Sequence, residues 1–250
     1  MDLNKSMIMT FCLFIFLLAG CQSDLMNTLP KEVGDMDQAE EQKVRELAID
    51  YTKKTYNKQF QVLEVSKNKA TGQSYLIRGI IKDGKDTEIT VILELPNEIR
   101  DTYVTTLWTE ELKPEMTSLV EKHMDIRKIE HIGYSNGTKK DQYTGEVPSV
   151  FEVLKKGGDR EYALTTTLRI YEENGQYEEG IKEFLQEIKA MNFNSVSVTI
   201  FVADDELKSA PKNIEESNYT LYRYNVNIDD IQKVDINNLD LDQYKTVIKH

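Results

Sequence analysis

The first amphipathic segment after the N-terminus has apolar residues at the spacing of a helix face. These residues are Val44, Leu47, Ala48 and Tyr51. They follow the i, i+3, i+4, i+7 pattern of a helix that covers a core. Asp37 and Glu40 precede them at the spacing of a capping box, which satisfies free N–H groups at a helix start. The pattern therefore predicts a helix from residue 37 to about residue 56.

The spacing of apolar residues then changes to one typical of strands. Runs rich in β-branched and apolar residues occupy 60–65, 75–81 and 89–95, and the third alternates with polar residues. Asp83-Gly84 between the second and third runs indicates a hairpin turn. Pro96 cannot donate to a strand ladder and is expected to end the third strand. We expect an antiparallel meander, which with the helix forms a subdomain spanning 37–134.

The middle of the chain returns to a helical pattern. Residues 101–124 are predicted to be helical, but Pro114 indicates a break, with a fresh helix starting near Lys113. Another strand is expected at 126–134. Residues 135–148 contain few apolar groups and are predicted to form an exposed loop between two subdomains.

The second half predicts a further α+β subdomain over 149–228. Ser149 and Glu152 indicate the start of a short helix that ends at Gly157-Gly158. A strand at 162–170, a turn at Asn174-Gly175, a helix at 177–191 and strands at 196–202 and 219–228 follow. The acidic tail, 229–250, is expected to be partly ordered. The predicted fold class is α+β.

The extreme N-terminus has the composition of a secretory signal. Lys5 precedes an almost unbroken apolar segment from Met7 to Gly20, which is short for a membrane span of about 20 residues. Residues 1–20 are therefore predicted to be a signal peptide. An uncleaved anchor helix is the alternative.

Leu18-Ala19-Gly20-Cys21 resembles the lipobox of bacterial lipoproteins. The resemblance covers the first 21 residues. It implies that a diacylglycerol is attached to the Cys21 thiol and that the chain is cut on the amino side of that cysteine. Residues 21–36 contain Pro30 and Gly34 without any periodicity, so they are expected to form a flexible tether.

Charge and cysteine content limit the partners. The chain of 250 residues has a formal net charge of −12. Nucleic-acid binding requires a basic patch, and no sufficiently long run of Lys and Arg is present, so we expect no nucleic-acid partner. The charge indicates solubility or, alternatively, a cationic partner. Of the two cysteines, Cys12 lies in the predicted signal, so the mature chain is expected to contain no disulfide.

The histidines do not indicate a catalytic or metal-binding site. They are His123, near a predicted helix end, His131, in a predicted strand, and His250, at the end of the chain. No zinc-type spacing of Cys and His accompanies them. The acidic stretches 204–206 and 235–242 are interpreted as solvated turns rather than calcium loops. We therefore expect no catalytic residues, no metal and no cofactor.

Aromatic residues provide one candidate binding surface. The last predicted strand and its start contain the set Tyr219, Tyr222, Arg223 and Tyr224. Tyr and Arg are favoured at protein interfaces, so this strand could present a face to a partner. Ordinary strand composition explains the same residues, because Tyr suits half-buried pleated surfaces. Trp108 is interpreted as a packing residue.

The composition of the body resembles that of small acidic cell-surface lipoproteins of low-GC Gram-positive bacteria. We expect an extracytoplasmic protein, attached to the cell membrane by the lipid on Cys21, that binds an envelope protein or a wall component without catalysis. Two alternatives remain open. The first is an enzyme whose carboxylates come together only in the fold. The second is a solute-binding lipoprotein of a transporter.

Overall fold

The computed structural model describes residues 36–96, 98–137, 143–211 and 213–248. The predicted signal peptide, the Leu18–Cys21 motif and the tether up to residue 35 lie outside the described residues. The described residues belong to one compact unit. Among the described residues, no helix is both long enough and apolar enough to cross a membrane.

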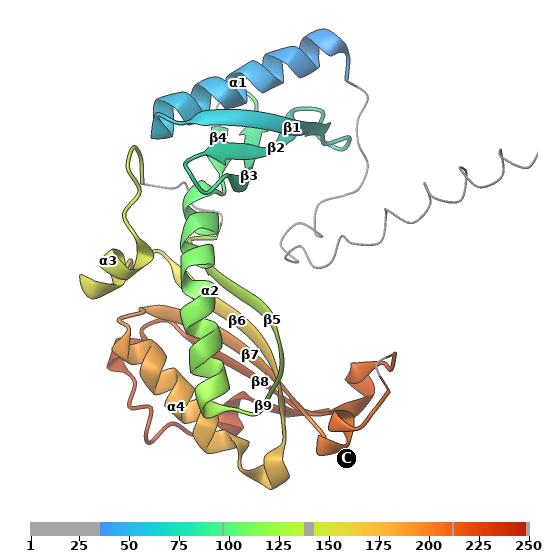
Figure 1. The fold of residues 1–250 in the computed structure, drawn as a ribbon, viewed down its shortest axis with the longest axis vertical. Coiled ribbons are helices and arrows are strands. Elements are labelled where there is room, and N and C mark those ends of the chain that lie inside the picture. The colour runs from blue at the N-terminus through green and yellow to red at the C-terminus, as the bar shows by residue number, and fades with distance from the viewer. Residues whose placement is uncertain (1–35, 97, 138–142, 212, 249–250) are drawn as a thin grey trace, which may run out of the picture. The chain divides into compact units, whose positions relative to one another are not determined.

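The first part of the body is a helix followed by a four-stranded antiparallel sheet (Figure 1). The elements are α1 (Gln38–Tyr56), β1 (Gln59–Lys67), β2 (Ser74–Lys82), β3 (Thr87–Glu94) and β4 (Glu98–Asp101). The strands pair in chain order, each with the next. The predicted helix, the three predicted strands and the hairpin at Asp83 are confirmed. The structure adds β4, which is too short to show a pattern of its own.

The start of α1 corrects one detail of the predicted capping box. Asp37 does cap the helix, since its carboxylate accepts a hydrogen bond of 2.8 Å from the Glu40 N–H. The Glu40 carboxylate, however, accepts bonds from Lys67 (2.7 Å) and Tyr75 (2.5 Å). These partners on β1 and β2 are absent from a local sequence window. Glu40 therefore joins α1 to the sheet.

Helix α2 (Tyr103–His123) is continuous, so the predicted break at Pro114 is wrong. Proline removes one backbone hydrogen bond, here the bond to the carbonyl of residue 110. Pro114 and Glu110 are both exposed, so water can reach that carbonyl. Trp108 and Leu112 on one side of the proline and Met116 on the other are fully buried, and their packing keeps the helix in one piece.

The second part contains a five-stranded sheet with the order β5-β6-β7-β8-β9. Its strands are β5 (Ile126–Ser135), β6 (Ala163–Tyr171), β7 (Ser195–Ala203), β8 (Thr220–Ile228) and β9 (Lys245–Val247). Strands β6 and β7 are parallel and are connected through α4 (Tyr177–Ala190), whereas the other neighbours are antiparallel. The short helix α3 (Val150–Lys155) begins after Ser149, as predicted. The α+β class is confirmed.

The acidic tail has a buried apolar side. The sequence predicted partial order from residue 229 onward. The structure describes the tail up to residue 248, including η5 (Ile231–Lys233) and η6 (Asp242–Tyr244). Its buried residues are Ile231, Ile236, Leu239 and Leu241, which belong to the main core. Gln186 and Lys189 of α4 donate hydrogen bonds to Asn237 and to the Val234 carbonyl. The widely spaced apolar residues thus attach the tail to α4.

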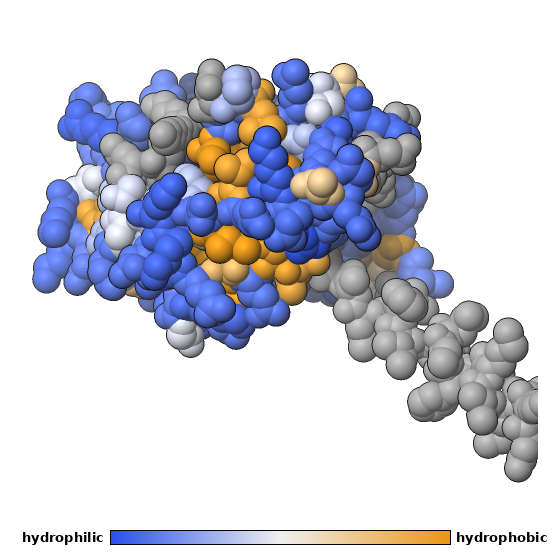
Figure 2. All heavy atoms as spheres, turned by 90° about the horizontal axis from the view of Figure 1, so that it is seen from above, coloured by the Kyte–Doolittle hydropathy of each residue, from blue (hydrophilic) through white to orange (hydrophobic). Residues whose placement is uncertain are grey.

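Apolar groups are also visible on part of the surface. Figure 2 shows a band of apolar side chains bordered by charged ones on the face seen from above. Large apolar residues with substantial exposure include Ile49 on α1 (40%) and Leu63 on β1 (50%). Leu63 lies where the pairing of β1 with β2 is irregular. Such a bulge bends an edge strand and disfavours pairing with another chain.

Candidate functional site

The two faces of the second sheet differ sharply in chemistry. On one face, β6 and β7 place fully buried residues such as Leu164, Leu168, Val198 and Ile200 in the core, on the side where Figure 1 shows α2 and α4. On the other face, Thr165 and Thr167 of β6 and Ser197, Thr199 and Phe201 of β7 are only half-buried, although both strands are central in the sheet. We call this second side the open face.

The strand register arranges the open face into three rows across the sheet. Row 1 is Gly133, Thr165, Ser197 and Asn227. Row 2 is His131, Thr167, Thr199 and Asn225. Row 3 is Arg169, Phe201 and Arg223. Residues opposite one another on paired strands point to the same side, so rows 1 and 2 present mainly hydroxyl and amide groups.

Hydrogen bonds between neighbouring strands hold the polar side chains of rows 1 and 2. The Ser197 hydroxyl donates to the Asn227 amide oxygen at 2.6 Å. The Thr199 hydroxyl approaches Asn225 at 3.5 Å. A hydroxyl group has both a donor and two acceptor lone pairs, so each of these groups keeps hydrogen-bonding capacity. Rows 1 and 2 therefore form a hydrogen-bonding surface made mainly of hydroxyl and amide groups.

Gly133 creates the space that His131 occupies at one edge of this surface. A Cβ at position 133 would lie 2.8 Å from His131 Nε2 and 2.9 Å from Thr165 Oγ1. Without that atom, the imidazole lies beside Gly133 and its Nε2 is 3.1 Å from the Thr165 hydroxyl. His131 is therefore a strand histidine, as predicted, and it contributes to the polar face.

Row 3 carries the positive charge of the open face. Arg169 is buried; its guanidinium donates to Thr220 (2.8 Å) and lies 5.0 Å from the centre of the Phe201 ring. Its Nε is 3.2 Å from Glu130 and 3.4 Å from Glu216. Arg169 is thus compensated by carboxylates and stacked on an aromatic ring, an arrangement that fixes its position.

The Glu216 carboxylate also lies close to two further cations at this end of the sheet. Lys128 lies 3.1 Å and Arg127 3.0 Å from its carboxylate. Burial acts to raise the pKa of Glu216, but the hydrogen bonds from Lys128 and Arg127 outweigh it and hold the pKa below its ordinary value. Glu216 is therefore ionised at neutral pH.

Arg223 differs from Arg169 because it is not compensated. It is half-buried, and its Nε has no hydrogen-bond partner. No ion pair joins its guanidinium to another residue in the part of the chain that the structure describes. Because no ion pair compensates its charge, the half-buried guanidinium of Arg223 beside Phe201 offers a place for an anion.

The structure separates the four residues of the predicted aromatic surface. Tyr224 is 0% exposed; its hydroxyl donates to Glu178 and lies 3.2 Å from the Tyr177 hydroxyl. Tyr222 is half-buried on the same side and stacks with Tyr177. Tyr219 precedes the strand in η4 (Glu216–Tyr219). Only Arg223 points to the open face, because side chains alternate along β8.

Sequence reasoning missed most of the open face. The alternation of Thr and Ser with apolar residues in 163–171 and 195–203 did contain a signal, since every second residue is small and polar. Period-two alternation shows that one side of a strand is polar. It does not show which strands are neighbours, and so it cannot place Phe201 between Arg169 and Arg223.

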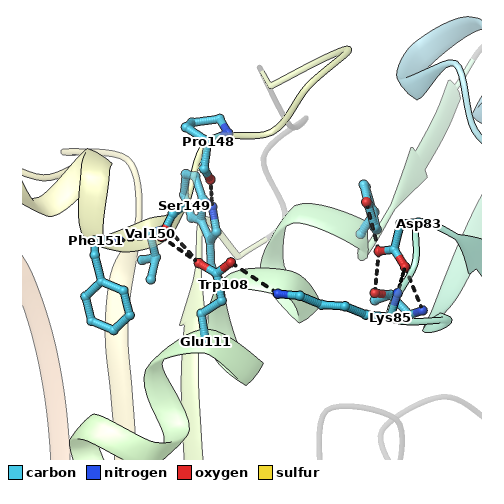
Figure 3. A network of polar contacts seen from close by, with 10 residues as sticks. Asp83, Lys85, Trp108, Glu111, Pro148, Ser149, Val150 and Phe151 are labelled. Atoms are coloured by element: carbon cyan, nitrogen blue, oxygen red, sulfur yellow. Dashed lines mark hydrogen bonds and ion pairs between the residues drawn. The ribbon is translucent and has the colours of Figure 1, made fainter.

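A second polar cluster connects the two halves of the body (Figure 3). The Glu111 carboxylate accepts bonds from the Ser149 hydroxyl and the Val150 N–H and lies 3.5 Å from the Lys85 Nζ. The Trp108 ring N–H donates to the Pro148 carbonyl at 2.8 Å. Trp108 is fully buried, as expected of a packing residue. This cluster fixes α3 and the preceding segment against α2.

Asp83 lies in the β2–β3 turn, in the same region as Lys85. Burial acts to raise its pKa, but hydrogen bonds from the Thr87 hydroxyl, the Lys85 N–H and the Tyr103 hydroxyl together lower it. Burial, followed by the bond to Asp83, raises the pKa of Tyr103. Asp83 is thus an ionised carboxylate with several donors, which suits it to holding the turn on α2 rather than to donating a proton.

His123 ends α2, as predicted, and borders a polar hollow of about 510 Å³. Its Nδ1 lies 2.8 Å from Glu183 and its Nε2 3.4 Å from Glu187, both on α4. These contacts join two helix surfaces. In the described ranges, no group of three or more His, Cys, Asp or Glu side chains is arranged to hold a metal ion.

Comparison with protein-family models, with curated proteins and with solved structures found no match for this chain.

Proposed function

We propose that this protein is an extracytoplasmic lipoprotein, attached to the cell membrane through lipid on Cys21, that binds a component of the envelope through its open face. The observation that carries the proposal is Leu18-Ala19-Gly20-Cys21, placed directly at the end of the apolar segment that begins at Met7. That combination has the order of a cleavable signal followed by a lipidation site.

The lipid on Cys21 attaches the protein to the membrane, so the body needs no membrane-binding surface of its own. Each buried methylene contributes about 0.8 kcal/mol, and a single acyl chain gives only reversible binding. A diacylglycerol on the Cys21 thiol adds a second chain and makes attachment stable. The sequence between Cys21 and Asp37 predicts a flexible tether, whose reach by the square-root rule for linkers would be roughly 20 Å.

The chemistry of the open face supports binding rather than catalysis. Rows 1 and 2 present mainly hydroxyl and amide groups, which both donate and accept hydrogen bonds, and row 3 presents the guanidinium of Arg223 without an ion pair in the described part of the chain. Fixed donors and acceptors favour recognition because little side-chain entropy is lost when a ligand binds. The open face therefore serves best as a recognition surface.

The anchor is tested by replacing each cysteine in the full-length chain. Cells that express wild type, Cys21→Ala or Cys12→Ala are labelled with a fatty acid and then fractionated. We expect wild type and Cys12→Ala to incorporate label and to remain with membranes, because Cys12 lies in the removed segment. Cys21→Ala should incorporate no label and lose stable membrane attachment.

The anchor would be contradicted if Cys21→Ala were recovered in full with the membranes and the wild type incorporated no fatty-acid label.

A further inference from the structure

We propose that the open face binds a wall polymer that combines sugar hydroxyls and N-acetyl amides with widely spaced carboxylates, with Arg223 contacting a carboxylate. The inference rests on the proposed function, because it names the ligand of that same surface. Three observations carry it: Arg223 without an ion pair among the described residues, the hydroxyl and amide groups of rows 1 and 2 beside it, and the low apolar content of the three rows.

Arg223 sets the charge of the ligand. The groups that face row 3 and its border are four basic side chains, Arg127, Lys128, Arg169 and Arg223, and two carboxylates, Glu130 and Glu216. The first three cations share the two carboxylates, so the cluster keeps a net positive charge. Arg223 is the cation of this set without an ion pair in the described part of the chain, and its planar guanidinium matches the geometry of a carboxylate.

The rest of the molecule limits how much negative charge the ligand can carry. The chain has a formal net charge of −12, so a densely charged polyanion would be repelled by most of the surface. One uncompensated arginine can accept one anionic group, not a continuous row of phosphates. A nucleic acid, with one charge per about 1.7 Å of duplex, requires a much broader basic patch. A ligand with few, widely spaced carboxylates can place one of them on Arg223 and is repelled less by the acidic remainder of the surface.

Rows 1 and 2 set the neutral part of the ligand. Ser197, Thr199 and Asn225 present hydroxyl and amide groups next to Phe201 in row 3. Sugar hydroxyls and N-acetyl amides are donors and acceptors of the same kind. Four strands at a spacing of about 4.8 Å extend the rows over roughly 14 Å, enough for a short stretch of polymer.

The composition of the face disfavours a stable protein partner. Protein interfaces of standard size bury about 800 Å² per partner around a core enriched in aromatic and apolar residues. Within the three rows, Phe201 is the single large apolar side chain, and it already stacks with Arg169. A surface made mostly of Ser, Thr and Asn gains little from the hydrophobic effect, so hydrogen bonds with a polar ligand are its main source of affinity.

The test uses full-length protein purified in detergent and peptidoglycan sacculi that have been stripped of attached phosphodiester polymers. Bound protein is measured by sedimentation over a range of sacculus concentrations. We expect wild type to bind and Arg223→Gln to bind about tenfold more weakly, because one charge-assisted contact is lost. Arg223→Lys should keep part of the affinity. Arg45→Gln, the same change on α1, should bind as wild type does.

A change in the ligand provides an independent test of the charge. Blocking the carboxylates of the sacculi with a neutral amine should weaken wild-type binding to the level of Arg223→Gln and should leave Arg223→Gln itself unchanged. Thermal melting of each variant confirms that it is folded.

The outcomes separate this inference from the anchor. Absence of wild-type binding, equal binding by wild type and Arg223→Gln, or unchanged binding to blocked sacculi would each overturn the inference. Equal competition by single-stranded DNA would overturn it as well, since a nucleic acid would then be an equivalent ligand. None of these results affects fatty-acid labelling of Cys21, which tests the anchor alone.

Discussion

Gly180 occupies the point where the end of α2 crosses α4, and its missing side chain allows the two helices to approach. A Cβ at this position would overlap the backbone carbonyl oxygen of His123. The clash would be with backbone, which cannot rotate away as the end of a flexible side chain can. From the sequence alone, a glycine inside a helix indicates only a cost in stability, because the neighbouring helix is not visible.

Replacement of this glycine should therefore have the opposite sign from the one that helix propensity predicts. Propensity alone would make Gly180→Ala stabilising by up to about 1 kcal/mol. We expect it to lower the free energy of unfolding by about 1–3 kcal/mol, the range for overpacking. Urea denaturation measures the difference. Glu179→Ala, at the exposed neighbouring position, should change stability by less than about 0.5 kcal/mol. An increase in stability for Gly180→Ala would show that the helices are not in close contact.

Helix α2 shows how tertiary packing overrides a local signal. Pro114 predicts a break from the sequence, yet the helix continues from Tyr103 to His123. Proline destabilises the helix locally, because one backbone hydrogen bond is missing, and this site lies on the exposed side of the helix. The gain comes from apolar side chains buried against two separate sheets, because α2 contacts both β3 and β5.

We therefore expect Pro114 to lower the stability of the protein without determining its fold. Pro114→Ala should restore a donor for the carbonyl of residue 110 and raise the free energy of unfolding by about 1–3 kcal/mol. The melting temperature should rise accordingly. The matched control is Glu115→Ala, also exposed on α2, which should have an effect of only a few tenths of a kcal/mol. A lower melting temperature for Pro114→Ala would mean that the proline is required in this helix.

At the scale of the whole molecule, the C-terminal tail is part of the core. Ile236 is 1% exposed and packs in the same cluster as residues of α4 and β7. Acidic composition made the segment look like a solvated tail, and its apolar residues follow neither a helical nor a strand period. Their burial depends on a surface formed by distant parts of the chain.

Truncation of one tail residue should thus destabilise the entire body. Ile236→Ala should lower the free energy of unfolding by about 2–5 kcal/mol, the range for buried large-to-small changes. Val247→Ala, at a position that is 48% exposed, should have an effect of less than about 1 kcal/mol. Intrinsic fluorescence of Trp108, which lies far from Ile236 in the sequence, should report a single transition for both variants. A wild-type-like transition for Ile236→Ala would show that the tail is detached.

Most elements could be predicted from local patterns, whereas the candidate site could not. The strands 60–65, 75–81 and 196–202 and the helix 177–191 were identified because apolar periodicity depends only on nearby residues. The exceptions are β4 and β9, which have only four and three residues, and the continuity of α2. Of the open face, only Arg223 was singled out in advance, and it was grouped with tyrosines that turn the other way.

The sequence by itself determined which segments are helices and strands and which side of each strand is polar, because these properties repeat within a few residues along the chain. Only the tertiary structure decided the lateral order β5-β6-β7-β8-β9. That order depends on how helices pack on one side of the sheet and on pairings between distant segments. It gives Arg169 its carboxylates and its aromatic neighbour, and it leaves Arg223 on the open face without an ion pair to any residue that the structure describes.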